Sequence, residues 1–143
     1  MFGVFNISAS GLSAQRLRMD IISDNIANSA TIRPATETPF QRRYPVFAVK
    51  QESGFAKALR RSTGQLGQGV RVVAIAKDDF TPGELVYKPE HPFADAQGYV
   101  HMPNVNMMRE MVNVMSASRA YEANVTALNA SKSMIAKALE IGR

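Results

Sequence analysis

The sequence contains no cysteine and no tryptophan among its 143 residues. Without cysteine, the chain has no disulfide framework, no thiolate metal site and no cysteine nucleophile. It also lacks the apolar run of about 18 residues that a membrane-spanning helix needs. Residues 1–7 lack the basic start and the apolar stretch of a secretory signal. We therefore expect no transmembrane segment, and either a cytosolic protein or one exported by a route that reads no such signal.

Recognisable catalytic motifs are missing as well. Gly64, Gly67 and Gly69 are spaced like part of a phosphate-binding loop, but no Lys-Ser or Lys-Thr pair follows them. The acidic and histidine residues of the middle region lack the spacing of a metal or acid-base site. These residues are Asp78, Asp79, His91, Asp95 and His101. We interpret them as solvated loop residues, and we expect no enzyme activity, no metal and no cofactor.

The chain is basic, with 17 Lys and Arg against 12 Asp and Glu and a formal net charge of +5. A positive balance would suit an anionic partner such as nucleic acid, because clustered cations release counterions when they bind phosphates. Here the basic residues are dispersed in pairs, such as Arg16 with Arg18 and Arg42 with Arg43, and no aromatic residues alternate with them. We therefore expect no nucleic-acid partner and interpret the charges as a solvated or assembly surface.

An amphipathic helix is predicted near the N-terminus. Its apolar residues recur seven positions apart, with one further residue completing the last step: Phe5, Leu12, Met19, Ile22 and Ile26. This spacing places them on one helical face. We expect a helix over about residues 8–28, with Ser8 or Ser10 as its N-cap. It must end before Pro34, because proline disfavours the helical conformation of the residue before it.

The last third of the chain carries a heptad seam, in which steps of three and four residues alternate. Its positions are Met111, Val114, Ser118, Tyr121, Val125, Leu128, Lys132, Ile135 and Leu139. Ser118 and Lys132 interrupt the seam, so it is not an ideal dimeric zipper. A helix from about Val105 to Ile141 would be roughly 55 Å long at about 1.5 Å per residue. Such a helix is longer than a compact chain of this size needs, which indicates partners outside the chain.

The middle region is rich in proline and glycine and is not helical in character. Tyr44–Val49 and Val70–Ala76 are predicted strands, Glu84–Lys88 is a candidate third, and Ser62–Gly69 is a polar loop. The chain is therefore predicted to be mainly α with a small β insertion. We divide it into an N-terminal helix in residues 1–34, a β and loop insertion in 35–103 and a C-terminal helix in 104–143. The two helices are expected to pack as a coiled-coil-like pair and to form one domain.

Several stretches resemble the flagellar axial proteins, which form the rod, the hook and the filament. The pattern SGLSA at residues 10–14, followed by DNIAN at residues 24–28, is similar to a signature shared by rod and hook subunits. PNVN at residues 103–106 and SASRAYEANV at residues 116–125 resemble the proximal-rod members in particular. So does the end of the chain, from Ala130 to Gly142. The resemblance covers nearly the whole sequence.

This resemblance implies a structural subunit of the periplasmic basal-body rod that polymerises through its terminal helices into a hollow helical drive shaft. It implies export through the flagellar type III apparatus without a cleaved signal peptide. The implied partners are other copies of the chain, rod subunits like FlgB, FlgF and FlgG, and proteins like FliE and FliF at the junction with the membrane ring. The alternative is a soluble coiled-coil adaptor, which would form a discrete dimer or trimer.

The expected assembly residues lie on the two seams. The helix and subunit packing set comprises Leu12, Met19, Ile22, Ile26, Met111, Val114, Tyr121, Val125, Leu128, Ile135 and Leu139. We expect incorporation to bury the four residues of the first helix against Val125, Leu128, Ile135 and Leu139, and the free helices to be partly disordered until then. Asn25 and Asn28 are expected either to cap the first helix or to form hydrogen bonds between subunits.

Overall fold

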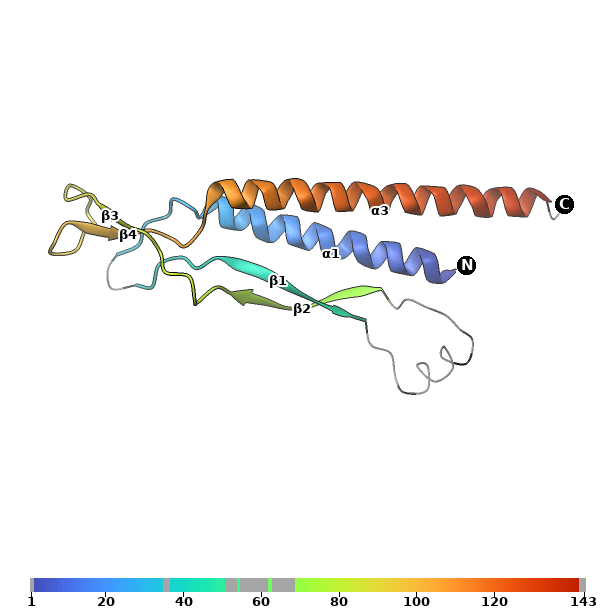
Figure 1. Ribbon diagram of the computed structural model, residues 1–143, viewed down its shortest axis with the longest axis horizontal. Coiled ribbons are helices and arrows are strands. Elements are labelled where there is room, and N and C mark those ends of the chain that lie inside the picture. The colour runs from blue at the N-terminus through green and yellow to red at the C-terminus, as the bar shows by residue number, and fades with distance from the viewer. Residues whose placement is uncertain (1, 35–36, 51–53, 55–61, 63–68, 142–143) are drawn as a thin grey trace.

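The computed structural model describes residues 2–34, 37–50, 54, 62 and 69–141. Two long helices lie side by side, and two small antiparallel strand pairs lie below them and at one end of the molecule (Figure 1). The elements are α1 (Phe2–Ala27), β1 (Arg43–Val49), β2 (Val70–Lys77), β3 (Leu85–Tyr87), β4 (Tyr99–His101) and α3 (Met107–Ile141). The prediction of a mainly helical fold with a small β insertion is confirmed.

Helices α1 and α3 run antiparallel. Near the middle of α1, a Cβ atom added to Gly11 would lie 3.0 Å from Oδ1 of Asn124. Near its end, Nδ2 of Asn25 lies 3.2 Å from Oε2 of Glu110. The absence of a side chain at Gly11 thus lets the two helices approach closely. Because α3 is the longer helix, its C-terminal turns continue past the start of α1 (Figure 1).

The first helix begins earlier than predicted, at Phe2 instead of about residue 8. Ser8 and Ser10 therefore lie inside the helix, and the N-cap prediction for them is wrong. The hydroxyl of Ser10 donates to the carbonyl oxygen of Ile7 at 2.7 Å and accepts from the main-chain N–H of Val70 at 3.1 Å. Gly11 lowers helix propensity by about 1 kcal/mol, yet the helix runs through it because close packing on α3 compensates.

Strands β1 and β2 form an antiparallel pair in which Arg43 lies opposite Lys77 and Val49 lies opposite Val70. The register shifts between Val46 and Phe47, which indicates a β-bulge that bends the ribbon locally. The predicted strands match these two elements to within one residue. The predicted polar loop Ser62–Gly69 lies mostly outside the described residues.

Strands β3 and β4 form the second pair, with Val86 opposite Val100. The first of these strands was predicted, as Glu84–Lys88, whereas β4 was not, because three residues are too few to show alternation. The rings of Tyr87 and Tyr99 meet edge to face, with centroids 5.3 Å apart. Gly98 turns the chain into β4 with a φ of +81°, a conformation that favours glycine.

The apolar core formed by the described residues is small. The buried hydrophobic residues among them are Ala14, Ile21, Ile22, Phe40, Val100 and Ala117. The fully buried larger side chains include two polar ones, Asn25 and Glu110, at the point where the helices meet the first strand. Polar contacts as well as apolar packing therefore hold the β insertion against the helices.

Candidate assembly interface and the polar junction behind it

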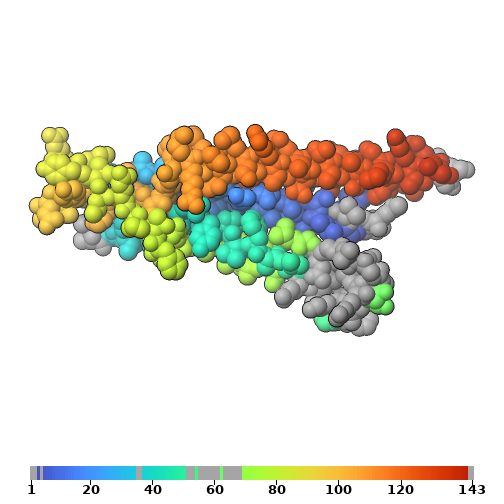
Figure 2. Space-filling model, viewed as in Figure 1, coloured from blue at the N-terminus to red at the C-terminus, as the bar shows by residue number. Residues whose placement is uncertain are grey.

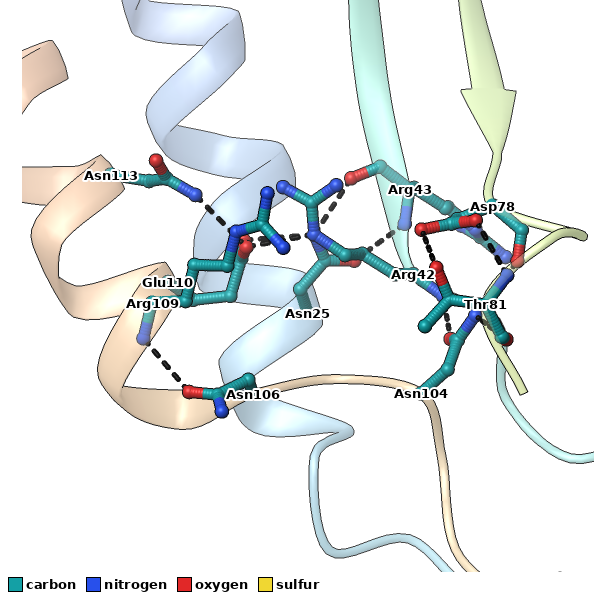
Figure 3. Close-up of polar contacts among 10 residues, drawn as sticks. All are labelled: Asn25, Arg42, Arg43, Asp78, Thr81, Asn104, Asn106, Arg109, Glu110 and Asn113. Carbon is teal, nitrogen blue, oxygen red and sulfur yellow. Dashed lines mark hydrogen bonds and ion pairs between the residues drawn. The ribbon is translucent and has the colours of Figure 1, made fainter. Parts of the chain in front are cut away.

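Glu110 is the centre of a buried polar cluster near the start of α3 (Figure 3). Its Oε1 accepts a hydrogen bond from Nε of Arg42 at 2.8 Å and another from Nδ2 of Asn113 at 3.0 Å. Its Oε2 accepts from Nδ2 of Asn25 at 3.2 Å. We call Asn25, Arg42, Asn104 and Glu110 the polar junction. It joins α1, α3 and the segment that leads into β1.

Asn25 links α1 to the backbone of the first strand. Its Oδ1 accepts from the main-chain N–H of Arg43 at 2.9 Å, and its Nδ2 donates to the carbonyl oxygen of Arg43 at 2.7 Å. With the bond to Glu110, both amide hydrogens and the amide oxygen of this fully buried side chain are used. The Asn25 amide therefore pairs with the N–H and the carbonyl oxygen of Arg43 as the backbone of a neighbouring strand would.

Asn104, like Asn25, forms hydrogen bonds to the backbone next to the strand pair. Its Oδ1 accepts from the main-chain N–H of Arg42 at 2.7 Å. Its Nδ2 donates to the carbonyl oxygens of Asp78 at 2.7 Å and of Thr81 at 3.0 Å. One side chain thus connects the start of β1, the end of β2 and the segment that enters α3. The start of α3 is consequently fixed relative to the strand pair.

The turn after β2 is held by Asp78. The hydroxyl of Thr81 donates to its carboxylate at 2.9 Å, and the main-chain N–H groups of Thr81 and Phe80 donate to it as well. The hydrogen bond from the Thr81 hydroxyl, followed by that from the Thr81 main chain, lowers the pKa of Asp78 below its ordinary value. The ionised carboxylate of Asp78 therefore stabilises this turn. The carbonyl oxygens of Asp78 and Thr81 in the turn accept the hydrogen bonds from Asn104.

Helix α3 is capped by Asn106, the residue that directly precedes it. Oδ1 of Asn106 accepts from the main-chain N–H of Arg109 at 3.0 Å, which satisfies one of the free donors of the first turn. The main-chain N–H of Glu110 then donates to the carbonyl oxygen of Asn106 at 3.0 Å. The cap thus fixes the turn that delivers the Glu110 carboxylate into the junction.

The energetic role of the junction follows from its burial. Taking a carboxylate out of water is costly, and an ion pair with additional hydrogen bonds offsets that cost without adding much net stability. Glu110 is completely buried, whereas the Arg42 side chain keeps 20% of its exposure. Once formed, the pair strongly disfavours any arrangement that separates it. We therefore interpret the junction as setting the geometry between the helices and the β insertion.

The packing residues predicted from the two seams differ in exposure within the single chain. Ile22 is buried, and most of the others are half-buried: Leu12, Met19, Ile26, Val114, Tyr121, Val125, Leu128 and Ile135. Met111 is 49% exposed and Leu139 is 71% exposed. The intrachain contact of the two helices thus uses part of the apolar surface and leaves the rest to solvent.

The antiparallel arrangement also decides which predicted residues meet. Ile22 and Ile26 lie near the Asn25–Glu110 contact, at the start of α3. Ile135 and Leu139 belong to the opposite end of α3, which continues past the start of α1 (Figure 1). Within one chain, therefore, the residues near the end of α1 do not pack on Ile135 and Leu139. Their expected burial against one another in an assembly stays a prediction.

The two asparagines of the DNIAN stretch have different roles. Asn25 neither caps α1 nor is available to another subunit, because all of its hydrogen-bonding atoms are used inside the chain. Asn28 makes local contacts at the end of α1, where its Nδ2 donates to the carbonyl oxygen of Asp24 at 2.8 Å and to Oδ1 of Asp24 at 3.0 Å. Part of Asn28 stays accessible to solvent.

The sequence reasoning missed Arg42 and Glu110 as structural partners. They are separated by 68 positions, and no periodic pattern marks either one. The signal that was present lies in the DNIAN and PNVN stretches, which carried the family resemblance and which contain Asn25 and Asn104. Both of these asparagines prove to be members of the polar junction.

In the described part of the chain, the Asp, Glu and His side chains form no group of three or more that could hold a metal ion. Its helices are too polar for any of them to cross a bilayer. What the described surface does offer is exposed apolar side chains along α3. The arrangement is therefore suited to contact with other helices.

Comparison with known proteins gives matches to two family models. The model described as "Flagella basal body rod protein" matches residues 5–33, and the model described as "Flagellar basal body rod FlgEFG protein C-terminal" matches residues 96–141. The first region contains most of α1, and the second contains β4 and α3. Asn25, Asn104 and Glu110 of the polar junction fall inside these two regions.

Curated relatives match along nearly the entire chain. The chain is 46% identical to the flagellar basal-body rod protein FlgC of Bacillus subtilis, over 99% of this chain and 98% of the relative. It is 45% identical to FlgC of Borreliella burgdorferi, over 99% and 97% of the two chains, and 41% identical to FlgC of Escherichia coli O157:H7, over 100% and 98%. The chain belongs to the FlgC family of flagellar basal-body rod proteins.

Proposed function

We propose that this chain builds the proximal part of the rod, where its two terminal helices pack with those of neighbouring subunits into a hollow helical shaft. Its family membership makes it a structural protein of the basal-body rod and does not favour the adaptor alternative. The observation that carries the finer proposal is the long helix pair, which leaves the apolar side chains Met111, Val112 and Leu139 about half exposed or more. Exposed apolar surface of this extent along a helix is typical of an interaction site.

The total surface supports the same proposal. The accessible surface of the chain is 10464 Å², whereas a compact folded monomer of this mass would expose roughly 7300 Å² by the usual scaling with mass. Figure 2 shows an elongated molecule in which α3 forms a ridge along the upper edge. Burial between subunits would remove this excess.

We further propose that the chain is organised as predicted, with helical regions in residues 1–34 and 104–143 that together form one domain and a β insertion in residues 35–103. The supporting observation is the polar junction, through which Asn25, Arg42 and Glu110 connect all three regions. In a rod, this arrangement would place the helices in the packed inner layer and the strand pairs outside it. The junction would then fix the angle between the two layers.

The partners and the export route are also proposals. We propose that the chain assembles with other copies of itself, with FlgB-, FlgF- and FlgG-like rod subunits and with FliE- and FliF-like proteins at the membrane ring, after export through the type III apparatus. The free subunit would keep its terminal helices partly disordered and order them on incorporation, since a small core stabilises an isolated chain weakly. We propose that it catalyses no reaction and binds no nucleic acid.

Fractionation tests this proposal directly. Basal bodies are purified from cells that express a tagged copy of the chain, and the rod fraction is probed for the tag. We expect the chain to copurify with intact basal bodies and the purified chain to sediment as monomer or heterogeneous polymer. A single small oligomer that is absent from basal bodies would contradict the proposal and favour the adaptor.

A further inference from the structure

We propose that a pocket between α1, the start of β1 and the first turns of α3 binds a glutamate side chain of a neighbouring acidic protein. We call it the arginine pocket, because Arg18, Arg42 and Arg43 line it. Its volume is ≈ 290 Å³. This inference rests on the proposed function, because it gives the chemistry of one partner that the rod subunit meets.

The three arginines of the pocket carry more charge than the chain itself neutralises. Nε of Arg42 lies 2.8 Å from Oε1 of Glu110, and Nη1 of Arg43 lies 3.5 Å from Oδ2 of Asp24. No described carboxylate lies within ion-pair distance of Arg18. Three guanidinium groups therefore share two carboxylates. The pocket keeps a net positive charge that suits an anionic group.

Two side chains of the pocket are fixed and still have hydrogen-bond donors available. Arg42 uses its Nε for Glu110 (Figure 3), and its two terminal nitrogens form no hydrogen bond with the described residues. Nδ2 of Asn113 donates to the same carboxylate and carries a second hydrogen. The Arg42 side chain keeps only 20% of its exposure. A second carboxylate would therefore meet donors that are already oriented and partly desolvated.

The apolar walls of the pocket select the kind of anion. Ile22, Pro45 and Phe47 line it together with the arginines. A free inorganic anion such as phosphate has no apolar part to place against them. A glutamate side chain carries its carboxylate on two methylene groups, which can cover the walls while the carboxylate reaches the cations. The combination of apolar walls and cations therefore favours a glutamate side chain.

Charge favours a different protein over a second copy of this chain as the source of the glutamate. The chain has a formal net charge of +5, so two copies repel each other at long range. A neighbour with a net negative charge is attracted instead, and complementary charge guides its approach and fixes its register. We therefore assign the arginine pocket to an acidic partner.

The test is zero-length crosslinking in intact basal bodies. Arg18→Lys keeps the positive charge and adds an amine, which a carbodiimide joins to a carboxylate in direct contact by forming an amide. The variant is expressed in place of the native chain, and mass spectrometry locates the crosslinks. We expect a crosslink from position 18 to a glutamate of a different, acidic protein. Arg16→Lys is the matched control and should lack this crosslink, because Arg16 is exposed on α1 outside the pocket.

The outcomes separate this inference from the proposed function. Variant chain that is present in basal bodies without a crosslink at position 18 would overturn the inference and leave the rod assignment intact. A crosslink to a second copy of the chain, or the same crosslink from Arg16→Lys, would overturn it as well. Absence of the native chain from basal bodies would contradict the proposed function itself.

A second measurement on the purified chain covers failure of Arg18→Lys to enter the rod. The probe is the α-amide of N-acetylglutamate, and thermal unfolding is followed at constant ionic strength. A ligand that binds the folded chain raises its Tm. We expect a saturable rise for the native chain and for Arg16→Gln. Arg18→Gln should bind the probe at least about tenfold more weakly, because a charged hydrogen-bond donor is lost.

Three results of this measurement would overturn the inference. The first is no rise in Tm for the native chain. The second is an equal rise with the α-amide of N-acetylglutamine, which has the same shape without the charge. The third is a larger rise with inorganic phosphate than with the glutamate probe, which would identify the pocket as a site for a small free anion.

Discussion

Asn25 and Arg43 are joined by two hydrogen bonds that pair a side-chain amide with a strand backbone. The Arg43 N–H donates to Oδ1 of Asn25 at 2.9 Å, and Nδ2 of Asn25 donates to the Arg43 carbonyl oxygen at 2.7 Å. Because Asn25 is fully buried, loss of its amide would remove both partners of the Arg43 main chain from inside the fold. A residue of α1 therefore takes the place of a neighbouring strand at the start of β1.

Replacement of Asn25 by alanine should lower the free energy of unfolding by about 1–3 kcal/mol, because buried donors and acceptors are left without partners. Urea unfolding followed by circular dichroism measures the change. Asn28→Ala is the matched control, since the side chain of Asn28 bonds only to Asp24 in the described structure. Equal effects of the two substitutions would contradict the role of Asn25 as the link.

The ion pair of Arg42 and Glu110 predicts strong coupling between the two residues. Arg42→Met alone leaves a buried carboxylate with one partner fewer and should cost about 3 kcal/mol. Glu110→Met should cost a similar amount. The double variant should cost clearly less than the sum, because neither charge is then left behind. Additive costs in a double-mutant cycle of urea unfolding would show that the pair does not act as a unit.

Replacement of Gly69 and of Gly3 by alanine should change the stability of the chain in opposite directions. Gly69 has a φ of +77°, and a side chain added there would collide with Ser10 of α1. Gly69→Ala should therefore destabilise the chain by roughly 1–2 kcal/mol. Gly3, in α1, has open space around it, so Gly3→Ala should stabilise the helix by about 0.5–1 kcal/mol. Thermal unfolding of the two variants measures both shifts, and a shift in the same direction for both would contradict the account.

The lowered pKa of Asp78 predicts acid sensitivity. A carboxyl whose pKa is lower in the folded state than in the unfolded state stabilises the fold above its unfolded pKa of about 4. That contribution is lost as the pH falls through the lower, folded value. Asp78→Asn should weaken the chain at neutral pH and flatten the loss of stability in acid, which urea unfolding at a series of pH values measures.

Charged residues on the seam of α3 should block assembly. Leu128→Asp and Ile135→Asp place a carboxylate on the face that packs on other helices, and both should abolish motility and rod formation. Asn129→Asp adds a similar charge at an exposed position and should leave motility intact. Swimming assays and electron microscopy of basal bodies give the readout. Normal motility in both seam variants would contradict packing through this face.

The long elements of the fold were predictable from sequence, because apolar residues at helical spacing mark α3 over ten turns and mark most of α1. The start of α1 was not predictable, since Gly11 and the serines near it suggest a helix boundary that packing on Asn124 overrides. Strand β4 was missed because three residues carry no alternation. Short elements are specified by their partners more than by their own sequence.

The polar junction could be predicted only in part. Its asparagines stand in stretches that attract notice by resemblance, but nothing local shows that Asn25 meets Glu110, which lies 85 positions away. A lone glutamate at the start of a helix is ordinarily a solvated residue near a favourable dipole. The burial of Glu110 depends on three donors, of which Asn113 lies in the same helix while Asn25 and Arg42 come from other segments that only the folded chain brings together.

The most direct test of the central claim is cryo-electron microscopy of basal bodies from cells that carry a tagged copy of this chain. We predict density for the chain in the rod just above the membrane ring, with paired antiparallel helices lining a channel and the strand pairs outside them. Basal bodies with an intact rod that lacks this chain would contradict the account.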